Sequence, residues 1–181
     1  AFLQFLERSA KTAPEAEARR RLRGLEICLE IFEKEAAETV KLAARCGHVS
    51  VRAQAARWLG IHGKPADLLP LLADAAPLVQ RNAIESAARF WGDPAAAPLV
   101  GSVFRLASTA DRRLRQAVIS SLAHLDPERL PAAKSAGEKI VRGWVLVRAA
   151  GRGKLPGESL DLGLTLLADK DTGTEDRLDA L

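Results

Sequence analysis

The feature of this sequence that most constrains its fold is a short pattern that recurs three times. Segments 54–59, 82–87 and 116–121 align with one another, at offsets of 28 and 34 residues. A turn-like stretch precedes each segment, and Gly60, Gly63 or the Gly92-Asp93-Pro94 stretch is expected to end the helix. A repeat of this length predicts stacked helix pairs, because one pair cannot bury both of its faces.

The composition agrees with helices. Ala and Leu dominate the 181 residues, aromatic residues make up 4%, and Tyr is absent. These proportions favour an all-α chain with more than about 60% helix and essentially no strand, and they exclude an ordinary β-sandwich or barrel. The sequence also has no run of about 18 apolar residues that could cross a membrane.

We expect a right-handed α-solenoid of five to six helix pairs that forms a single domain over residues 1–181. The pairs are predicted at residues 2–11 with 15–33, 35–46 with 49–61, 66–73 with 77–91, 95–107 with 111–124, 127–134 with 136–150, and 159–168 with 174–181. The repeats are clearest over residues 35–125. The last pair is expected to be truncated, and both ends of the array are expected to touch neighbouring protein.

Residues 51–60, which read Val-Arg-Ala-Gln-Ala-Ala-Arg-Trp-Leu-Gly, resemble the second helix of a HEAT repeat. The pattern V-R-x-x-A-A-x-A-L-G belongs to the short bacterial type, which also occurs in phycobilisome-lyase-like proteins. Two repeats depart from it: Gln80 stands where the Arg is expected, and Asp126-Pro127 stands where Gly-Asp is usual. The resemblance implies a helical-repeat scaffold.

A narrower resemblance concerns residues 166–170 and 176–181. These short stretches are similar to a passage in large multidomain bacterial proteins that join a sugar-dehydrogenase-like propeller, HEAT repeats and a c-type cytochrome. That likeness implies an excised segment of a longer chain in the periplasm or cell envelope. Without it, a cytoplasmic location is expected.

Three arginines lie near the start of equivalent, repeated helices. They are Arg52, Arg81 and Arg115, and stacking of the repeats would bring them into a ladder. The resemblance to HEAT arrays implies that such an Arg pairs with an Asp of the adjoining repeat, here Asp74 or Asp111. A structural role is favoured over a ligand site.

Small and bulky side chains recur in the same helices. Ala55, Ala83 and Ala117 are predicted at helix–helix contacts, because a small side chain lets two backbones approach closely. Trp58 and Trp91 are expected to fill gaps between repeats, provided that each indole N–H finds a partner.

The sequence offers little sign of catalysis or metal binding. Its two cysteines, Cys28 and Cys46, are eighteen residues apart, and its three histidines lack the spacing of metal ligands. We expect no metal, no cofactor and no catalytic residue, so any catalysis would lie in other domains of a parent protein. Whether the two cysteines pair is left open.

Charge leaves three functions open. Residues 155–181 hold seven acidic and two basic residues, a net charge of −5, so the first 154 residues carry +9 of the total of +4. The favoured function is a non-catalytic scaffold that binds protein or neighbouring domains of the same polypeptide, without membrane insertion. The alternatives are a nucleic-acid-binding repeat protein with a basic face, and a repeat-type lyase or glycosylase-like enzyme.

Overall fold

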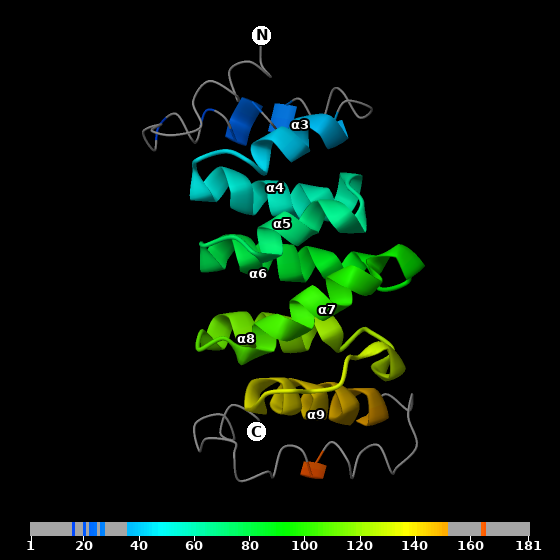
Figure 1. Ribbon diagram of the computed structural model, residues 1–181. Coiled ribbons are helices and arrows are strands. Elements are labelled where there is room, and N and C mark those ends of the chain that lie inside the picture. Colours follow the sequence, from blue (N-terminus) through cyan, green and yellow to red (C-terminus); the bar gives the residue numbers. More distant parts are fainter. Residues whose placement is uncertain are drawn as a thin grey trace. The chain divides into compact units, whose positions relative to one another are not determined.

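The computed structural model describes residues 36–151 together with Ala16, Arg20, residues 22–24, Glu26, Ile27, Leu164 and Thr165. Helices and connecting turns make up residues 36–151, and no strand occurs among the described residues (Figure 1). The all-α prediction is thus confirmed for this part of the chain. The first and last predicted helix pairs lie almost wholly outside it, and so does Cys28.

The chain divides into two compact units, residues 1–90 and residues 91–181. Unit 1 contains α3 (Ala36–Ala43), α4 (Val49–His62), the 3₁₀ helix η1 (Pro65–Leu68) that runs into α5 (Leu69–Leu72), and α6 (Pro77–Ala87) with the 3₁₀ turn η2 (Ala88–Phe90). These bounds match the second and third predicted pairs within a few residues. The prediction of one domain over residues 1–181 stays a prediction.

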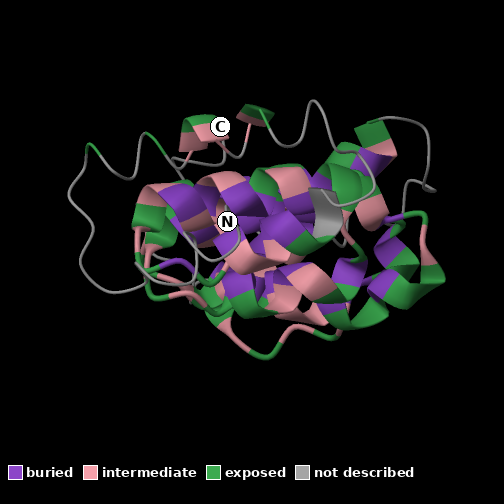
Figure 2. Ribbon diagram, turned by 90° about the horizontal axis from the view of Figure 1, so that it is seen from above, coloured by how far each residue is buried: buried purple, intermediate pink, exposed green. Residues whose placement is uncertain are grey.

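The core of unit 1 lies between α4, α6 and the η1–α5 segment. Val51, Leu59, Leu68, Val79 and Ile84 are fully buried there. Along each helix, buried positions alternate with exposed ones at helical spacing (Figure 2). The apolar side of each helix therefore faces its partners, and most charged side chains lie on the opposite side.

Gly60 has a different role from the one predicted from the sequence. It does not end its helix, because α4 continues to His62 and Gly63 is the residue that caps it, with its N–H donating to the Leu59 carbonyl at 3.0 Å. A Cβ atom on Gly60 would lie 2.8 Å from the Cβ of Ser86 on α6, well inside van der Waals contact. The glycine is needed for the close approach of α4 and α6, and the prediction of a helix end there is wrong.

Unit 2 contains the 3₁₀ turn η3 (Pro94–Ala96) that leads into α7 (Ala97–Arg105), the turn η4 (Leu106–Ser108), α8 (Arg112–Leu122), the turn η5 (Pro127–Arg129) and α9 (Ala136–Gly151). The fourth predicted pair and the second helix of the fifth are present. Leu99, Val103, Phe104, Val118 and Leu122 form the centre of its core.

The predicted helix at residues 127–134 is wrong. Only the short turn η5 forms, and Leu130 is extended, with φ −71° and ψ 132°. The next residue is Pro131, whose ring disfavours helical backbone at the residue before it. The Arg142 guanidinium then donates from Nη1 to the carbonyls of Leu130 and Pro131, at 3.2 and 2.7 Å, so the extended segment is fixed against α9.

Candidate interaction surfaces

Arg52 links successive helix pairs in unit 1. Its Nε and Nη2 donate to the two carboxylate oxygens of Asp74, at 2.7 and 3.0 Å, and its Nη1 donates to the carbonyls of Cys46 and Gly47. Asp74 also accepts from the N–H of Ala76 at 2.9 Å, directly before α6. Arg52 therefore joins α4 to the turn that precedes it and to the turn that precedes α6.

The electrostatics of this pair follow from its geometry. The side chains of Arg52 and Asp74 are 18% and 11% exposed, so water screens them little. The hydrogen bond from Arg52 lowers the pKa of Asp74 below its usual value, against the opposing effect of burial. Asp74 is the Asp of the adjoining repeat that the ladder hypothesis names.

The other two arginines of the predicted ladder have different surroundings. Arg81 lies on α6 with its Nε 3.5 Å from the carboxylate of Glu85, one turn along the same helix, and that buried nitrogen has no hydrogen-bond partner. Arg115 is half-buried on α8 and lines a recess. Asp111, the second predicted partner, caps α8 by accepting from the N–H of Leu114 at 3.1 Å.

The three repeated alanines are all buried, with Ala55 and Ala83 fully covered and Ala117 8% exposed. The hydrogen bond made by the residue before Ala83 was not predicted. Asn82, next to Ala83, donates from its buried amide to the carbonyl of Ala53 at 2.8 Å, and its own side-chain oxygen has no hydrogen-bond partner. The sequence signal was the Asn itself, which is shorter than the Gln at the aligned positions and can fit in the joint.

The two predicted gap-filling tryptophans differ in burial. Trp91 is 5% exposed, and its indole N–H donates to the carbonyl of Ser121 at 2.8 Å. Arg129 fixes the same turn by donating to the carbonyls of Trp91 and Asp93. Trp58 is only half-buried on α4. Within unit 2 the indole of Trp91 therefore ties the turn before η3 to α8.

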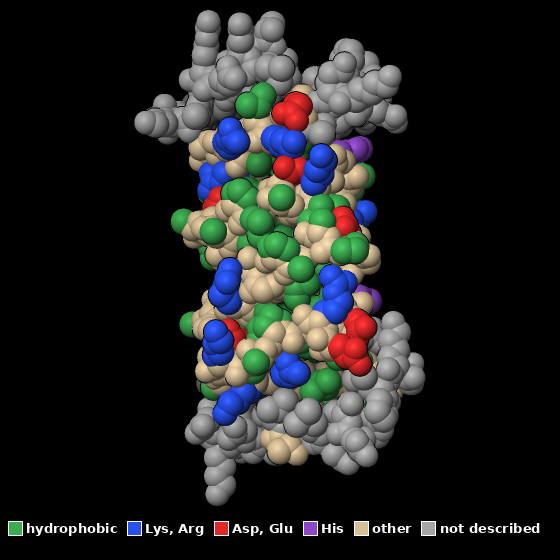
Figure 3. Space-filling model, turned by 45° about the vertical axis from the view of Figure 1, so that its right-hand side comes forward, with side chains coloured by type: hydrophobic (Ala, Val, Ile, Leu, Met, Phe, Trp, Pro, Cys, Tyr) green, Lys and Arg blue, Asp and Glu red, His purple; other side chains and the backbone are tan. Residues whose placement is uncertain are grey.

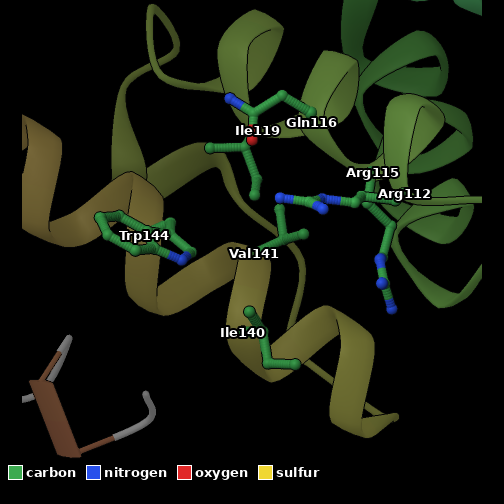
Figure 4. A pocket seen from close by; sticks show the side chains of 7 residues that line it. All are labelled: Arg112, Arg115, Gln116, Ile119, Ile140, Val141 and Trp144. Carbon is green, nitrogen blue, oxygen red and sulfur yellow. The ribbon is translucent and has the colours of Figure 1, made fainter. Parts of the chain in front are cut away.

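A recess opens between α8 and α9 in unit 2. It is lined by Arg112, Arg115, Gln116 and Ile119 of α8 and by Ile140, Val141 and Trp144 of α9, which we call the α8–α9 recess. Side chains of both helices line it (Figure 4). Its volume is about 30 Å³. Guanidinium groups thus adjoin aliphatic and indole surface, without an acidic residue among these seven.

The position of α9 beside this recess is fixed by its first turn. Ser135 and Glu138 form a capping box, in which the serine hydroxyl accepts from the N–H of Glu138 and the carboxylate accepts from the N–H of Ser135, each at 3.2 Å. A Cβ on Gly137 would lie 2.4 Å from the Ala107 carbonyl oxygen, so the backbones nearly touch there. The Ser-x-x-Glu spacing could have revealed the cap from the sequence.

A second hollow lies in unit 1 beside α3 and the η1–α5 segment. It has a volume of about 140 Å³, and we call it the α3–α5 groove; it is lined by Lys41, Ala44, Arg45, Leu59, Ala66, Asp67, Pro70 and Leu71. Lys41 pairs with Glu38 at 3.0 Å and lies 3.8 Å from Asp67. The hydrogen bond to Glu38 and the charge of Asp67 raise the pKa of Lys41. This groove therefore mixes both signs of charge over an apolar floor.

The basic residues of each unit are dispersed on the face shown in Figure 3, where acidic and hydrophobic side chains lie between groups of Lys and Arg. Within the described residues, no three His, Cys, Asp or Glu side chains are grouped so that they could hold a metal ion. No helix in the same part of the chain has the length and apolar character needed to cross a membrane.

Comparison with known proteins identifies the repeats. No curated protein and no solved structure matches the chain. A family model described as HEAT repeats matches residues 36–123, just under half of the sequence. That range runs from the start of α3 through α8. The successive helix pairs within each unit agree with this match, and residues 36–123 are similar to HEAT repeats.

Proposed function

We propose that this chain is a non-catalytic helical-repeat module that binds protein, either a separate partner or neighbouring domains of the same polypeptide. One observation supports it most: each unit carries a shallow hollow in which basic side chains adjoin an apolar floor. At about 30 and 140 Å³ these hollows are smaller than the roughly 300–1,000 Å³ of sites that enclose a small molecule. They suit side chains presented by another protein surface.

The polar groups of the repeats support the same proposal. Arg52, Asp74 and Asn82 are used to join helices, and Arg129 and Arg142 donate to backbone carbonyls in turns. These groups hold the array in shape, which is what a scaffold requires. The likeness of residues 166–170 and 176–181 to multidomain bacterial proteins extends the proposal to a module placed between other domains, with those domains as its contacts.

Site-specific photocross-linking in the source cells tests the proposal. A photoreactive amino acid is placed at Ala66 of the α3–α5 groove and at Gln116 of the α8–α9 recess, both of which are exposed. Glu85 and Ser120, exposed on α6 and α8, serve as controls outside the hollows. Discrete protein adducts at the first two positions alone support a protein-binding module. Adducts with no difference between hollow and control positions contradict it.

Nucleic acid is the second candidate, because residues 36–151 hold sixteen Lys and Arg against nine Asp and Glu. Phosphate contacts by such residues weaken steeply with salt, so titration with duplex and single-stranded DNA at about 150 mM salt distinguishes the two functions. Under the protein-binding proposal DNA binds weakly and is released by added salt. Tight, salt-resistant DNA binding by a monomer would replace it with the nucleic-acid function.

A further inference from the structure

The α8–α9 recess has walls that are fixed before any ligand arrives. The capping box at Ser135 and Glu138, the backbone contact at Gly137 and the two hydrogen bonds from Arg142 all hold α9 in place. Trp144 lies on the same helix, two residues after Arg142. A preformed wall loses little conformational entropy on binding, so even a small contact area can give measurable affinity.

The charge beside the recess is positive. The α8 sequence begins Arg112-Arg113-Leu114-Arg115, and its first turn has no acidic residue, although Asp111 supplies one carboxylate as the cap. A helix N-terminus already carries partial positive charge, so three guanidinium groups there add like charge to like. An anionic ligand is favoured at this place on both counts.

The side chains that line the recess further restrict the kind of ligand that can bind there. A guanidinium group matches a carboxylate, because two parallel N–H groups can donate to its two oxygens. Ile119, Ile140 and Trp144 offer apolar surface within the same recess. Its volume of about 30 Å³ admits one small apolar group and no more. A ligand that fits has carboxylates beside an aliphatic side chain, which describes an acidic peptide.

We propose that the α8–α9 recess binds an acidic peptide segment of a partner protein, with a carboxylate on Arg115 and an aliphatic side chain against Ile119 and Trp144. This inference rests on the proposed protein-binding function and names the chemistry of the partner. Arg and Trp are the side chains that most often dominate the energy of protein interfaces. Arg112 adds a second guanidinium at the exposed rim of the recess.

The test uses the full chain and a fluorescein-labelled eight-residue peptide of six glutamates and two leucines, followed by fluorescence anisotropy. The matched control peptide has glutamine in place of glutamate. Arg115→Gln is expected to weaken binding about tenfold, and Arg113→Gln, which removes the same charge outside the recess, by no more than about twofold. Trp144→Leu should weaken binding too, without changing its salt dependence.

Several outcomes would overturn the proposal. Equal losses for Arg113→Gln and Arg115→Gln would show general attraction between charges. Absence of saturable binding up to about 1 mM, or equal binding of the glutamine peptide, would exclude an acidic-peptide site. Tighter binding of a single-stranded oligonucleotide with the same loss for Arg115→Gln would assign the recess to nucleic acid. If Arg115→Gln does not fold, Arg112→Gln at the exposed rim replaces it, with the same prediction.

The two experiments distinguish a wrong acidic-peptide proposal from a wrong protein-binding proposal. If the peptide does not bind but discrete protein adducts still form at Ala66 and Gln116, the chain binds protein through other chemistry. If neither is seen, the protein-binding function itself is contradicted.

Discussion

The joint between α4 and α6 in unit 1 and the joint between α8 and α9 in unit 2 are built from different residues. Gly60 lets α4 approach Ser86 of α6, Asn82 of α6 bonds to α4, and the Arg52–Asp74 pair joins α4 to the turn before α6. At the second joint, residues 127–134 do not form the expected helix, and Arg112, Arg115 and Trp144 line a recess. The regular repeat closes its joint with small residues and internal pairs, whereas the departing repeat presents basic and aromatic side chains.

The comparison teaches where to look for function in a repeat chain. Residues that agree with the repeat pattern act on their neighbours in the array, as Arg52 does on Asp74. Stretches that break the pattern, such as residues 127–134, can take on another role, because the array no longer dictates their side chains. Arg115, which lies near the start of α8 as Arg52 lies near the start of α4, lines the α8–α9 recess.

The largest effect is expected from the two tryptophans of unit 2. Trp91→Ala should lower the free energy of unfolding by about 3–5 kcal/mol, because it empties a buried site and leaves the Ser121 carbonyl without its indole donor. Trp144→Ala, at the half-buried wall of the recess, should cost less than about 2 kcal/mol. Urea unfolding of both variants checks this. Equal losses would mean that the recess wall is core.

A smaller effect is expected at the close approach in unit 1. Gly60→Ala should lower the free energy of unfolding by about 2 kcal/mol, because the clash with Ser86 outweighs the better helix propensity of Ala. Gly101→Ala on α7 is the matched control, since its Cβ would meet nothing within 4 Å. That variant should be unchanged or more stable by up to about 1 kcal/mol. A stabilised Gly60→Ala protein would contradict the packing described for α4 and α6.

The Arg52–Asp74 pair predicts a dependence of stability on pH. Because the pKa of Asp74 is lowered in the folded protein, its contribution is complete above the ordinary value of 3.8 and is lost as pH falls below it through the folded pKa. Asp74→Asn should therefore cost about 1.5 kcal/mol at pH 7 and almost nothing at strongly acid pH. Urea unfolding of both proteins across this range measures the difference. A loss that does not change with pH would point to packing instead of charge.

Much of this fold could be predicted from the sequence, because the same residue pattern recurs in three helices. The pattern around Ala55, Ala83 and Ala117 predicted α4, α6 and α8 within a few residues. The wrong predictions concern residues whose type is compatible with two different local structures. Gly60 fits a helix end by its residue type, but glycine also permits the close packing found here, and Pro131 lies inside the stretch 127–134 where the repeat predicts a helix.

The candidate site was less predictable than the fold. Arg115 was singled out, but as a member of a ladder with Arg52 and Arg81. Its place in the same recess as Trp144 depends on how α9 packs on α8, and these two residues are 29 apart in the sequence. The local residue pattern does not indicate which side chains, so far apart in the sequence, line the same recess. The capping box that fixes α9 was visible in the sequence as Ser135-Ala136-Gly137-Glu138 and is the signal that could have been used.

The smallest loss of stability is expected from a change in that capping box. This change should affect the α8–α9 joint and leave the α4–α6 joint unaltered. Ser135→Ala removes the hydroxyl that accepts from the N–H of Glu138 and should lower the free energy of unfolding by about 1 kcal/mol. The loss should be local: hydrogen exchange should quicken in the first turn of α9 while α4 and α6 stay unchanged. Because α9 forms one wall of the α8–α9 recess, the acidic peptide should also bind a few-fold more weakly. Ser120→Ala, an exposed serine on α8, is the control and should change neither quantity. If Ser135→Ala loosened α9 without affecting peptide binding, the fixed position of this helix would have no part in recognition.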